Sequence, residues 1–256
     1  MCRIAAYIGN PIPLAEALYR PPHSLEHQSY APREQLHGKV NVDGTGVAWW
    51  DGIDPRPLRY VTPLAPWQDA NLPHLAQRLS AHAFLAAVRS ASSGIPVGAA
   101  NVAPFVVGTM AGVHNGFIAG FRGALGRELV SSLSAQSYEQ LHTVSDSLAL
   151  LLVVLEHYSG DLAQAMIDGL GTIGELVRRH DSQATLNVVI ADGTNVVAAR
   201  HSVNEPLNSL YTAARSTGSW VVSEPLDDRD DWRPVPEHHL VHVTADGVQL
   251  QPLELS

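Results

Sequence analysis

The residue with the clearest chemical potential is Cys2, the only cysteine among the 256 residues of the chain. If Met1 is removed, Cys2 carries a thiol and a free α-amine on one carbon atom. The ordinary pKa of an α-amine lies well below that of a lysine, so part of it is uncharged near neutral pH and can accept the thiol proton. Nucleophile and base would then come from the same residue. The alternative is that Cys2 is a small, inert, buried hydrophobe.

His114-Asn115-Gly116 is the second group with chemical potential. The side-chain amide of Asn115 and the backbone N–H of Gly116 could together donate two hydrogen bonds to the oxyanion of a tetrahedral intermediate. The alternative is a β-turn, because Asn-Gly is a common turn dipeptide. The tripeptide alone fits either interpretation.

Two charged residues, Arg89 and Asp146, stand next to predicted elements. Arg89, followed by Ser90, ends an apolar predicted strand, where its guanidinium either reaches solvent or clamps a carboxylate. Asp146, between Ser145 and Ser147, opens a predicted helix, where Ser or Asp is also a common N-cap. Each of these positions therefore has both a structural and a functional interpretation.

Runs of β-branched and aromatic residues bounded by Gly, Pro, Asn and Asp predict a strand-rich chain. The clearest signal is a hairpin of Leu186–Ala191 with Asn195–Arg200, because the Asp192-Gly193 step between them supplies the positive φ angles of a tight turn. These two strands should be antiparallel. Further strands are expected at Arg3–Ile8, Thr45–Trp50, Phe84–Ser90, Leu210–Ala213, Trp220–Ser223, His239–Val243 and Val248–Pro252.

Helical spacing lies mainly between two groups of predicted strands. Strands, helices and strands again, without regular βα alternation, indicate an α+β fold with antiparallel sheets in a single domain, residues 1–256. The Pro-rich stretch Pro55–Pro66 is expected to be a surface loop. Helices are expected at Leu14–Leu18, Leu75–His82, about 145–157, 160–169 and 174–179.

Two motifs suggest a cofactor or a metal but lack the required context. Gly169-x-Gly171-x-x-Gly174 has the spacing of a dinucleotide-binding fingerprint, yet helical spacing precedes it where a strand is required, so we expect a turn between two helices. His23 and His27 are four residues apart, but they follow Pro21-Pro22 and lack the glutamate of a zinc protease. We therefore expect no cofactor and no metal site.

The overall composition excludes several classes of partner. A net charge of −9 argues against binding to nucleic acid or to an anionic membrane surface. The longest apolar run, Leu148–Leu155, is far shorter than the roughly 20 residues that span a bilayer, and no signal peptide precedes it. We expect a cytoplasmic protein that acts on a small molecule.

Taken together and in this order, these residues resemble the class II glutamine amidotransferases, a family of N-terminal-nucleophile hydrolases. The resemblance implies a four-layer αββα sandwich of two antiparallel sheets. It also implies hydrolysis of a γ-glutamyl amide through a glutamyl thioester. The motifs that carry the resemblance are Cys2, Asn41-x-Asp43-Gly44-x-Gly46, Arg89, His114-Asn115-Gly116 and Ser145-Asp146-Ser147.

The resemblance also implies a role for each site residue. Cys2 would be the nucleophile and its α-amine the base, with Asn115 and Gly116 as the oxyanion hole. Arg89 would hold the α-carboxylate and Asp146 the α-ammonium of the glutamyl group. The neighbouring residues expected to bind substrate are Ser90, His114 and Ser145.

The leaving group stays open at this point. No synthase domain is recognised beside the hydrolase domain, so the chain either hydrolyses a γ-glutamyl amide by itself or supplies ammonia to a synthase partner in trans. A non-catalytic γ-glutamyl-binding protein is a third alternative, and any of these could be a homo-oligomer.

The segment from Ser223 to Asp228 is similar to a free-standing subgroup of the family, which acts on a γ-glutamyl intermediate of ergothioneine biosynthesis. That intermediate carries a trimethylammonium group, which aromatic faces and carboxylates bind well. The candidates by residue type are Tyr30, Trp49, Trp50, Asp227 and Asp228.

Overall fold

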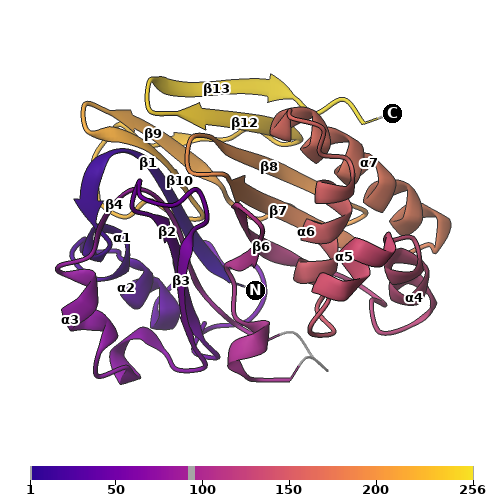
Figure 1. Ribbon diagram of the computed structural model, residues 1–256, viewed down its shortest axis with the longest axis horizontal. Helices are drawn as coiled ribbons and strands as arrows, with labels where there is room; N and C mark the ends of the chain where they lie inside the picture. The colour runs from indigo at the N-terminus through magenta and orange to yellow at the C-terminus, as the bar shows by residue number, and fades with distance from the viewer. Residues whose placement is uncertain (1, 92–95, 256) are drawn as a thin grey trace.

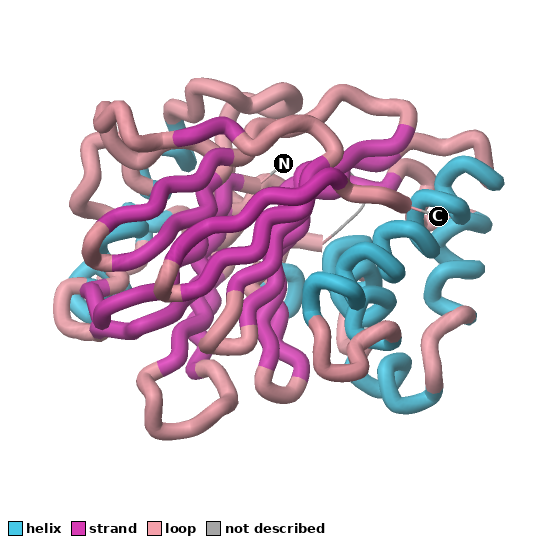
Figure 2. Tube along the Cα trace, turned by 90° about the horizontal axis from the view of Figure 1, so that it is seen from above, coloured by secondary structure: helices cyan, strands magenta, loops and turns pink. Residues whose placement is uncertain are grey.

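Two antiparallel β-sheets form the centre of the molecule, and helices cover both outer faces (Figures 1 and 2). The structure, a computed structural model, describes residues 2–91 and 96–255. Helices α4 to α7 lie beyond one sheet and α1 to α3 beyond the other, so four layers follow one another. This confirms the expected α+β class and its two antiparallel sheets.

The first sheet has seven strands in the order β11-β9-β10-β1-β4-β2-β3. Its central strand β1 pairs with β4 on one side, where Arg3 lies opposite Val88, and with β10 on the other, where Ala5 lies opposite Val222. Cys2 therefore precedes the central strand of this sheet. The bounds are β1 (Arg3–Pro13), β2 (Thr45–Trp50), β3 (Leu58–Thr62), β4 (Ser80–Val88), β9 (Tyr211–Arg215), β10 (Gly218–Val222) and β11 (Arg233–Pro234).

The second sheet has six strands in the order β13-β12-β8-β7-β6-β5. The predicted hairpin is confirmed: Ala191 pairs with Val196 across the turn at Gly193, whose φ of 92° favours glycine. The bounds are β5 (Phe105–Val107), β6 (Met110–Ile118), β7 (Ala184–Ala191), β8 (Val196–Val203), β12 (His239–Thr244) and β13 (Gly247–Pro252).

Helices α6 and α7 pack on each other and cover the six-stranded sheet, while the short helices α1, α2 and α3 cover the seven-stranded one. In the described parts of the chain, we find no helix with the length and apolar character needed to cross a bilayer. The helices are α1 (Ala15–Leu18), α2 (Leu25–Tyr30), α3 (Leu72–Ala76), α4 (Ala124–Ser131), α5 (Ala135–Gln140), α6 (Asp146–Glu156) and α7 (Leu162–Arg179), with 3₁₀ turns η1 (Pro66–Gln68) and η2 (Ala99–Asn101).

Strand β1 is apolar on both faces because both faces are covered. Ile4, Ala6 and Ile8 belong to the core between the sheets, whereas Ala5 and Tyr7 pack under the short helices. Successive side chains of a strand point to opposite faces, so a continuous apolar run suits a strand between two layers.

The sequence predicts a turn at Gly169–Gly174, and this prediction is wrong. The glycine motif lies in the middle of the continuous helix α7. A Cβ atom on Gly169 would lie 2.7 Å from the Cα of Val154 in α6. The missing side chain lets the two helices approach closely. Packing against α6 thus outweighs the roughly 1 kcal/mol that a glycine costs in a helix.

Pairing between strands also overrides two further predictions. Of the predicted helix Leu75–His82, only the start is helical, since α3 ends at Ala76 and β4 begins at Ser80 to pair with β1 and β2. The loop predicted at Pro55–Pro66 contains the edge strand β3, which pairs with β2. Prolines flank this strand instead of interrupting it, as is usual for an edge.

Strand β1 is longer than predicted, because it continues past Gly9-Asn10-Pro11 to Pro13. Its pairing register with β4 shifts between Ile8 and Ile12, and such an irregularity accommodates the extra residues.

Candidate active site

Cys2 lies at a cleft between the ends of the two sheets and the start of α6. The thiol-bearing residue is partly exposed. Every predicted site residue except Asn115 lines this cleft, together with residues of the 101–105 segment. The lining residues are Cys2, Ala87, Arg89, Ser90, Asn101, Ala103, Phe105, His114, Gly116, Ser145, Asp146 and Ser147.

Asn115 is the predicted site residue that does not line the cleft, yet it sits between two that do. It lies within β6, fully buried, so the turn interpretation of Asn115-Gly116 is wrong and the segment is extended. Its Nδ2 atom is buried and has no hydrogen-bond partner among the described residues. A buried N–H without a partner is costly, and a ligand oxygen that accepted its hydrogen bond would remove this cost.

Asn208 orients Asn115, and the sequence analysis missed it. The Asn208 Nδ2 donates to the backbone oxygen of Asn115 at 3.0 Å and to its Oδ1 at 3.5 Å. Asn187 Nδ2 donates in turn to the backbone oxygen of Asn208 at 3.2 Å. With Oδ1 placed on the Asn208 side, the amide presents Nδ2 in the other direction. Asn208 precedes β9 in a loop, where no periodicity marks a buried polar residue.

Arg89 supplies a buried positive charge to the cleft. Its side chain is 6% exposed, Nη2 donates to the backbone oxygen of Pro96 at 3.3 Å, and Nη1 has no partner among the described residues. No described carboxylate pairs with it. A guanidinium with a free N–H in a buried cleft is suited to bind a carboxylate.

Asp146 supplies a buried negative charge to the same cleft. It is the first residue of α6; its Oδ2 accepts a hydrogen bond from the Ile118 N–H at 3.1 Å and its Oδ1 from the Ser147 N–H at 2.8 Å. No described Lys, Arg or His forms an ion pair with it. The helix N-terminus stabilises the carboxylate. Ser145 holds the N-cap position, but its side chain caps no helix N–H.

His114 supports the cleft with both ring nitrogens. Nε2 donates to the backbone oxygen of Thr185 at 2.8 Å, and Nδ1 lies 3.0 Å from the Ser147 hydroxyl, which can donate to it. Burial lowers the pKa of His114, so the ring is neutral. Because both nitrogens are engaged by the protein, His114 orients Ser147 and has no nitrogen left for the direct substrate contact expected from the sequence.

Gly116 is required by the space around it. A Cβ atom there would lie 1.8 Å from the Thr185 oxygen and 2.5 Å from the His114 Nε2. No larger residue fits without moving the backbone of β7. Because Gly116 has no side chain, the main chain of β6 itself lines the cleft at this residue.

The motif from Asn41 to Gly46 holds Arg89 in place. The N–H of Asp43 donates to the Arg89 oxygen at 2.9 Å, and the Arg89 N–H donates to the Gly44 oxygen at 2.8 Å. The Asp43 carboxylate accepts from the Ala91 N–H at 2.7 Å. These bonds fix the backbone at Arg89 and at Ala91. At Gly46, a Cβ atom would lie 2.1 Å from the oxygen of Ala103, which lines the cleft.

The residues suggested for a trimethylammonium group do not line the cleft. Trp50 is the last residue of β2 and pairs with Ala83, whereas the first residue of β2, Thr45, pairs with Val88 next to Arg89. Asp227 binds Arg215 and accepts from the Trp232 Nε1–H at 2.8 Å. The structure therefore does not support the assignment of Tyr30, Trp49, Trp50, Asp227 and Asp228 to this role.

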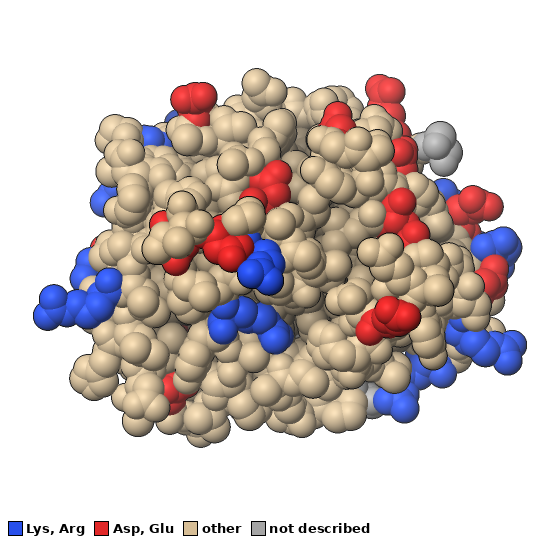
Figure 3. Space-filling view, viewed as in Figure 1, with Lys and Arg blue, Asp and Glu red and all other residues tan. Residues whose placement is uncertain are grey.

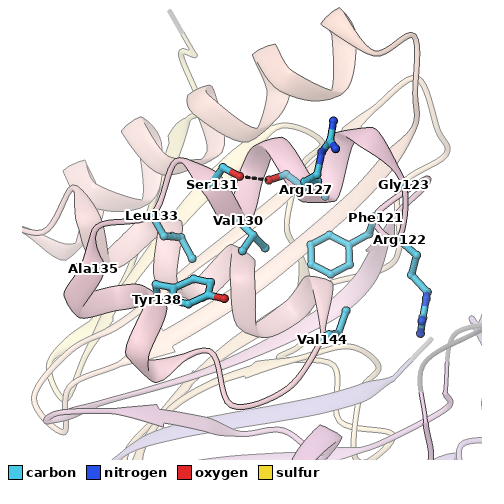
Figure 4. A pocket seen from close by; sticks show the side chains of 11 residues that line it. Phe121, Arg122, Gly123, Arg127, Val130, Ser131, Leu133, Ala135, Tyr138 and Val144 are labelled. Atoms are coloured by element: carbon cyan, nitrogen blue, oxygen red, sulfur yellow. Dashed lines mark hydrogen bonds between the residues drawn. The ribbon is translucent and has the colours of Figure 1, made fainter.

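A second hollow lies between α4, α5 and the start of α6 (Figure 4). It is about 570 Å³ and is lined by apolar side chains such as Phe121, Val130 and Val144, with Arg127 and Tyr138 beside them. None of the predicted site residues lines it. Among residues 2–91 and 96–255, no group of three or more potential metal ligands occurs.

Charges on the face shown in Figure 3 are mixed. Acidic and basic side chains are interspersed there and form no continuous basic surface. This agrees with the excess of 25 acidic over 16 basic residues.

The chain belongs to the class II glutamine amidotransferases, since the model of the family "Glutamine amidotransferases class-II" matches residues 21–217. Among curated proteins, it is similar to the γ-glutamyl-hercynylcysteine sulfoxide hydrolases of two mycobacteria. Identity is 34% over 254 residues with the protein of Mycobacterium tuberculosis H37Rv, covering 99% of this chain and 97% of that protein. With the protein of Mycolicibacterium smegmatis it is 35%, covering 99% and 100%.

More distant relatives are similar in sequence or in structure. A probable glutamine amidotransferase of Saccharomyces cerevisiae, DUG3, is 27% identical and covers 99% of this chain and 84% of that protein. A glutamine aminotransferase class-II domain protein from Silicibacter pomeroyi has a TM-score of 0.77 at 24% identity, with 100% of both chains covered. The Bacillus subtilis glutamine phosphoribosylpyrophosphate amidotransferase has a TM-score of 0.70 at 16% identity, with 100% of this chain and 50% of that chain covered.

Proposed function

We propose that the protein hydrolyses a γ-glutamyl amide, with γ-glutamyl-hercynylcysteine sulfoxide as its substrate. Identities of 34% and 35% over nearly the full length of the hydrolases named for that compound support the substrate. The observation that carries the reaction is the content of one cleft: a thiol, a buried guanidinium and a buried carboxylate, the last two without an ion-pair partner among the described residues. The α-carbon of a glutamyl group bears a carboxylate and an ammonium, which complement Arg89 and Asp146.

The first half of the reaction forms a thioester on Cys2. The α-amine of Cys2 takes the thiol proton, and the thiolate attacks the γ-carbonyl carbon. The resulting oxyanion accepts hydrogen bonds from Asn115 Nδ2 and the Gly116 N–H. When the intermediate collapses, the C–N bond breaks and the leaving amine takes the proton from the α-ammonium. This step requires a mature chain that begins at Cys2, because a retained Met1 would acylate the base.

The second half of the reaction releases glutamate. A water molecule gives a proton to the α-amine and attacks the thioester carbonyl, and the same two donors stabilise the second oxyanion. The C–S bond then breaks and the thiolate recovers the proton. The sum is one water consumed, one glutamate and one free amine formed.

Ammonia supply to a synthase partner is the second candidate function. It is favoured by the yeast relative named as a probable glutamine amidotransferase and by the larger phosphoribosylpyrophosphate enzyme, of which this chain matches half. It predicts glutamine as the preferred substrate and turnover that rises when a partner is added.

A substrate panel tests the proposal against this alternative. Glutamate release is measured for glutamine, a simple γ-glutamyl amide and γ-glutamyl-hercynylcysteine sulfoxide. We expect kcat/KM to be highest for the sulfoxide. Efficient turnover of glutamine together with none of the sulfoxide would instead favour the ammonia-supplying subunit.

A further inference from the structure

We propose that Arg3 is a positioning residue for the nucleophile: by holding the carbonyl oxygen of Cys2, it fixes the Cys2–Arg3 peptide plane and so the position of the Cα atom that carries the thiol and the α-amine. The inference rests on the proposed function, in which Cys2 attacks the substrate. The Arg3 Nε donates to the Cys2 oxygen at 2.8 Å, and the side chain is completely buried. Arg3 is the residue next to the nucleophile, yet it is not among the residues that line the cleft.

The guanidinium of Arg3 is itself anchored by Glu224. Nη1 donates to the Glu224 Oε1 at 2.8 Å, and both side chains are essentially inaccessible to solvent. A guanidinium is planar and its donors form a rigid fork, so a carboxylate that holds Nη1 also fixes the direction of Nε. Glu224 therefore helps to fix the point at which Nε meets the Cys2 carbonyl oxygen.

Glu224 is held from two further segments of the chain. Its Oε2 accepts from the His23 Nε2 at 2.7 Å and from the Arg33 N–H at 2.8 Å, and its Oε1 also accepts from the Glu34 N–H at 3.1 Å. Burial alone would raise the pKa of Glu224. The bond from His23, the bond from the Arg33 backbone and the charge of Arg3 together lower its pKa to about 2, so the carboxylate is charged at neutral pH.

An anchor at this position answers a specific difficulty of an N-terminal nucleophile. Chain termini are the least ordered part of most domains, and a mature chain would be tethered to Cys2 from one side only. A tilt of the peptide plane between Cys2 and Arg3 would displace the Cα atom that carries the thiol and the amine. A hydrogen bond to the carbonyl oxygen restricts this tilt. The next residue is fixed separately, because the Ile4 N–H donates to the Ser223 Oγ and the Ser223 N–H to the Ile4 oxygen, both at 3.0 Å.

Stability alone does not account for the arrangement. A buried ion pair is a weak source of stability, because desolvation of the two charges offsets their attraction. The Nη2 atom of Arg3 is also buried without a partner among the described residues, which costs further free energy. An orienting role for Nε explains why a charged residue occupies this position.

The test compares Arg3→Lys with Arg215→Lys. Lysine keeps the positive charge next to Glu224 but lacks the fork that reaches the Cys2 oxygen. Arg215 is the matched control, because it also binds carboxylates, those of Asp227 and Asp231, and its described side-chain bonds do not involve Cys2. Intact mass is first measured to establish that Met1 is absent from each protein. Since Cys2 is the only cysteine, its alkylation by iodoacetamide counts the reactive sites.

We expect Arg3→Lys to lower kcat per alkylatable site about 10- to 100-fold while KM changes less than about twofold, because a misplacement of about 1 Å can cost about 10²-fold. The alkylation rate of Cys2 should change as well. Arg215→Lys should behave as the wild type in both assays, apart from a lower melting temperature. A purely structural role would lower the melting temperature or the number of reactive sites in both variants and leave the rate per site unchanged.

Equal kcat per site and equal alkylation rates in the two variants would overturn the inference. If Arg3→Lys does not fold, the double variant Arg3→Met with Glu224→Met removes both charges together and is expected to show the same loss of kcat. Absence of any γ-glutamyl turnover in the wild type would contradict the proposed function instead. The alkylation comparison would still decide whether Arg3 orients Cys2.

Discussion

Arg89 and Asn115 each bury a hydrogen-bond donor that no described protein group satisfies. Such a donor costs about 1–3 kcal/mol relative to one that is paired. Arg89, the residue after β4, lines the cleft together with Cys2, and Asn115 lies in β6 between two residues that line it. In the proposed mechanism a glutamyl substrate accepts hydrogen bonds from both donors. The free energy lost by leaving these donors unpaired in the free protein is then recovered when the substrate or its oxyanion is bound.

Replacing Asn115 with alanine tests the oxyanion role. The variant loses one of two donors to the oxyanion and is expected to lower kcat about 10²- to 10³-fold, with a much smaller change in KM, because the bond strengthens as charge develops. Steady-state kinetics with the preferred γ-glutamyl substrate measure both constants.

Asn195→Ala is the matched control for this variant. Asn195 lies in the turn between β7 and β8, where its side chain binds Asp192. It should keep the wild-type kcat. If Asn115→Ala also kept kcat within about threefold, the donor would lie elsewhere.

The site residues differ in how far the sequence could predict them. Cys2, Arg89 and Asp146 are suggested by residue type and order, because the chemistry requires a thiol, a cation and an anion. Arg3 and Glu224 are 221 positions apart, and nothing in the local pattern of either residue indicates that they meet. A role that depends on such a pairing becomes visible only when the fold is known.

At the scale of elements, α6 and α7 show how glycines can serve packing. The glycine spacing of α7 suggested a turn, but the helix is continuous and Gly169 lies against Val154 of α6. Strand β6 was missed for a related reason, since His114-Asn115-Gly116 has low strand propensity and a turn-like dipeptide. Its pairing with β7 along residues 111–118 decides the conformation.

Two alanine substitutions in α7 should have opposite effects on stability. In Gly169→Ala the new Cβ would lie 2.7 Å from the Cα of Val154, so the helices must separate and the free energy of unfolding should fall by about 1–3 kcal/mol. In Gly174→Ala the atom nearest to the new Cβ is 3.4 Å away, on the flexible end of Arg178. The higher helix propensity of alanine should therefore raise the free energy of unfolding by about 0.5–1 kcal/mol.

Urea unfolding of the two variants measures both changes. Effects of the same sign and size would show that contact between α6 and α7 does not determine the glycine at position 169.

At the scale of the whole molecule, Glu224 joins the start of the chain to its C-terminal part. It binds Arg3, the first paired residue of β1, and follows β10 by two residues. The carboxylate thus links Cys2, the segment before α2 and the C-terminal strands. A fold with antiparallel sheets was predictable from strand and turn patterns, but this link across the chain was not.

The low pKa of Glu224 predicts how stability depends on pH. Above the ordinary pKa of a glutamate, the carboxylate is charged in both the folded and the unfolded state, and its full contribution is present. As pH falls from about 5 towards about 2, the unfolded state binds a proton that the folded state does not bind, so stability is lost. The lost contribution should be on the order of 3 kcal/mol.

Urea unfolding between pH 7 and about pH 3 measures this dependence. Glu224→Gln should be less stable at pH 7 and show a shallower fall with acid, whereas Glu139→Gln, at an exposed position of α5, should follow the wild type. A wild-type slope in Glu224→Gln would show that other groups carry the acid sensitivity.

The central claim is that Cys2, freed of Met1, forms the covalent intermediate. Intact-mass spectrometry after acid quench during turnover, followed by peptide mapping, tests it most directly. We predict a chain that starts at Cys2, an added mass equal to one glutamyl group on the Cys2 peptide, and no such adduct in Cys2→Ala. A retained Met1 in fully active protein, or turnover that persists in Cys2→Ala, would contradict the claim.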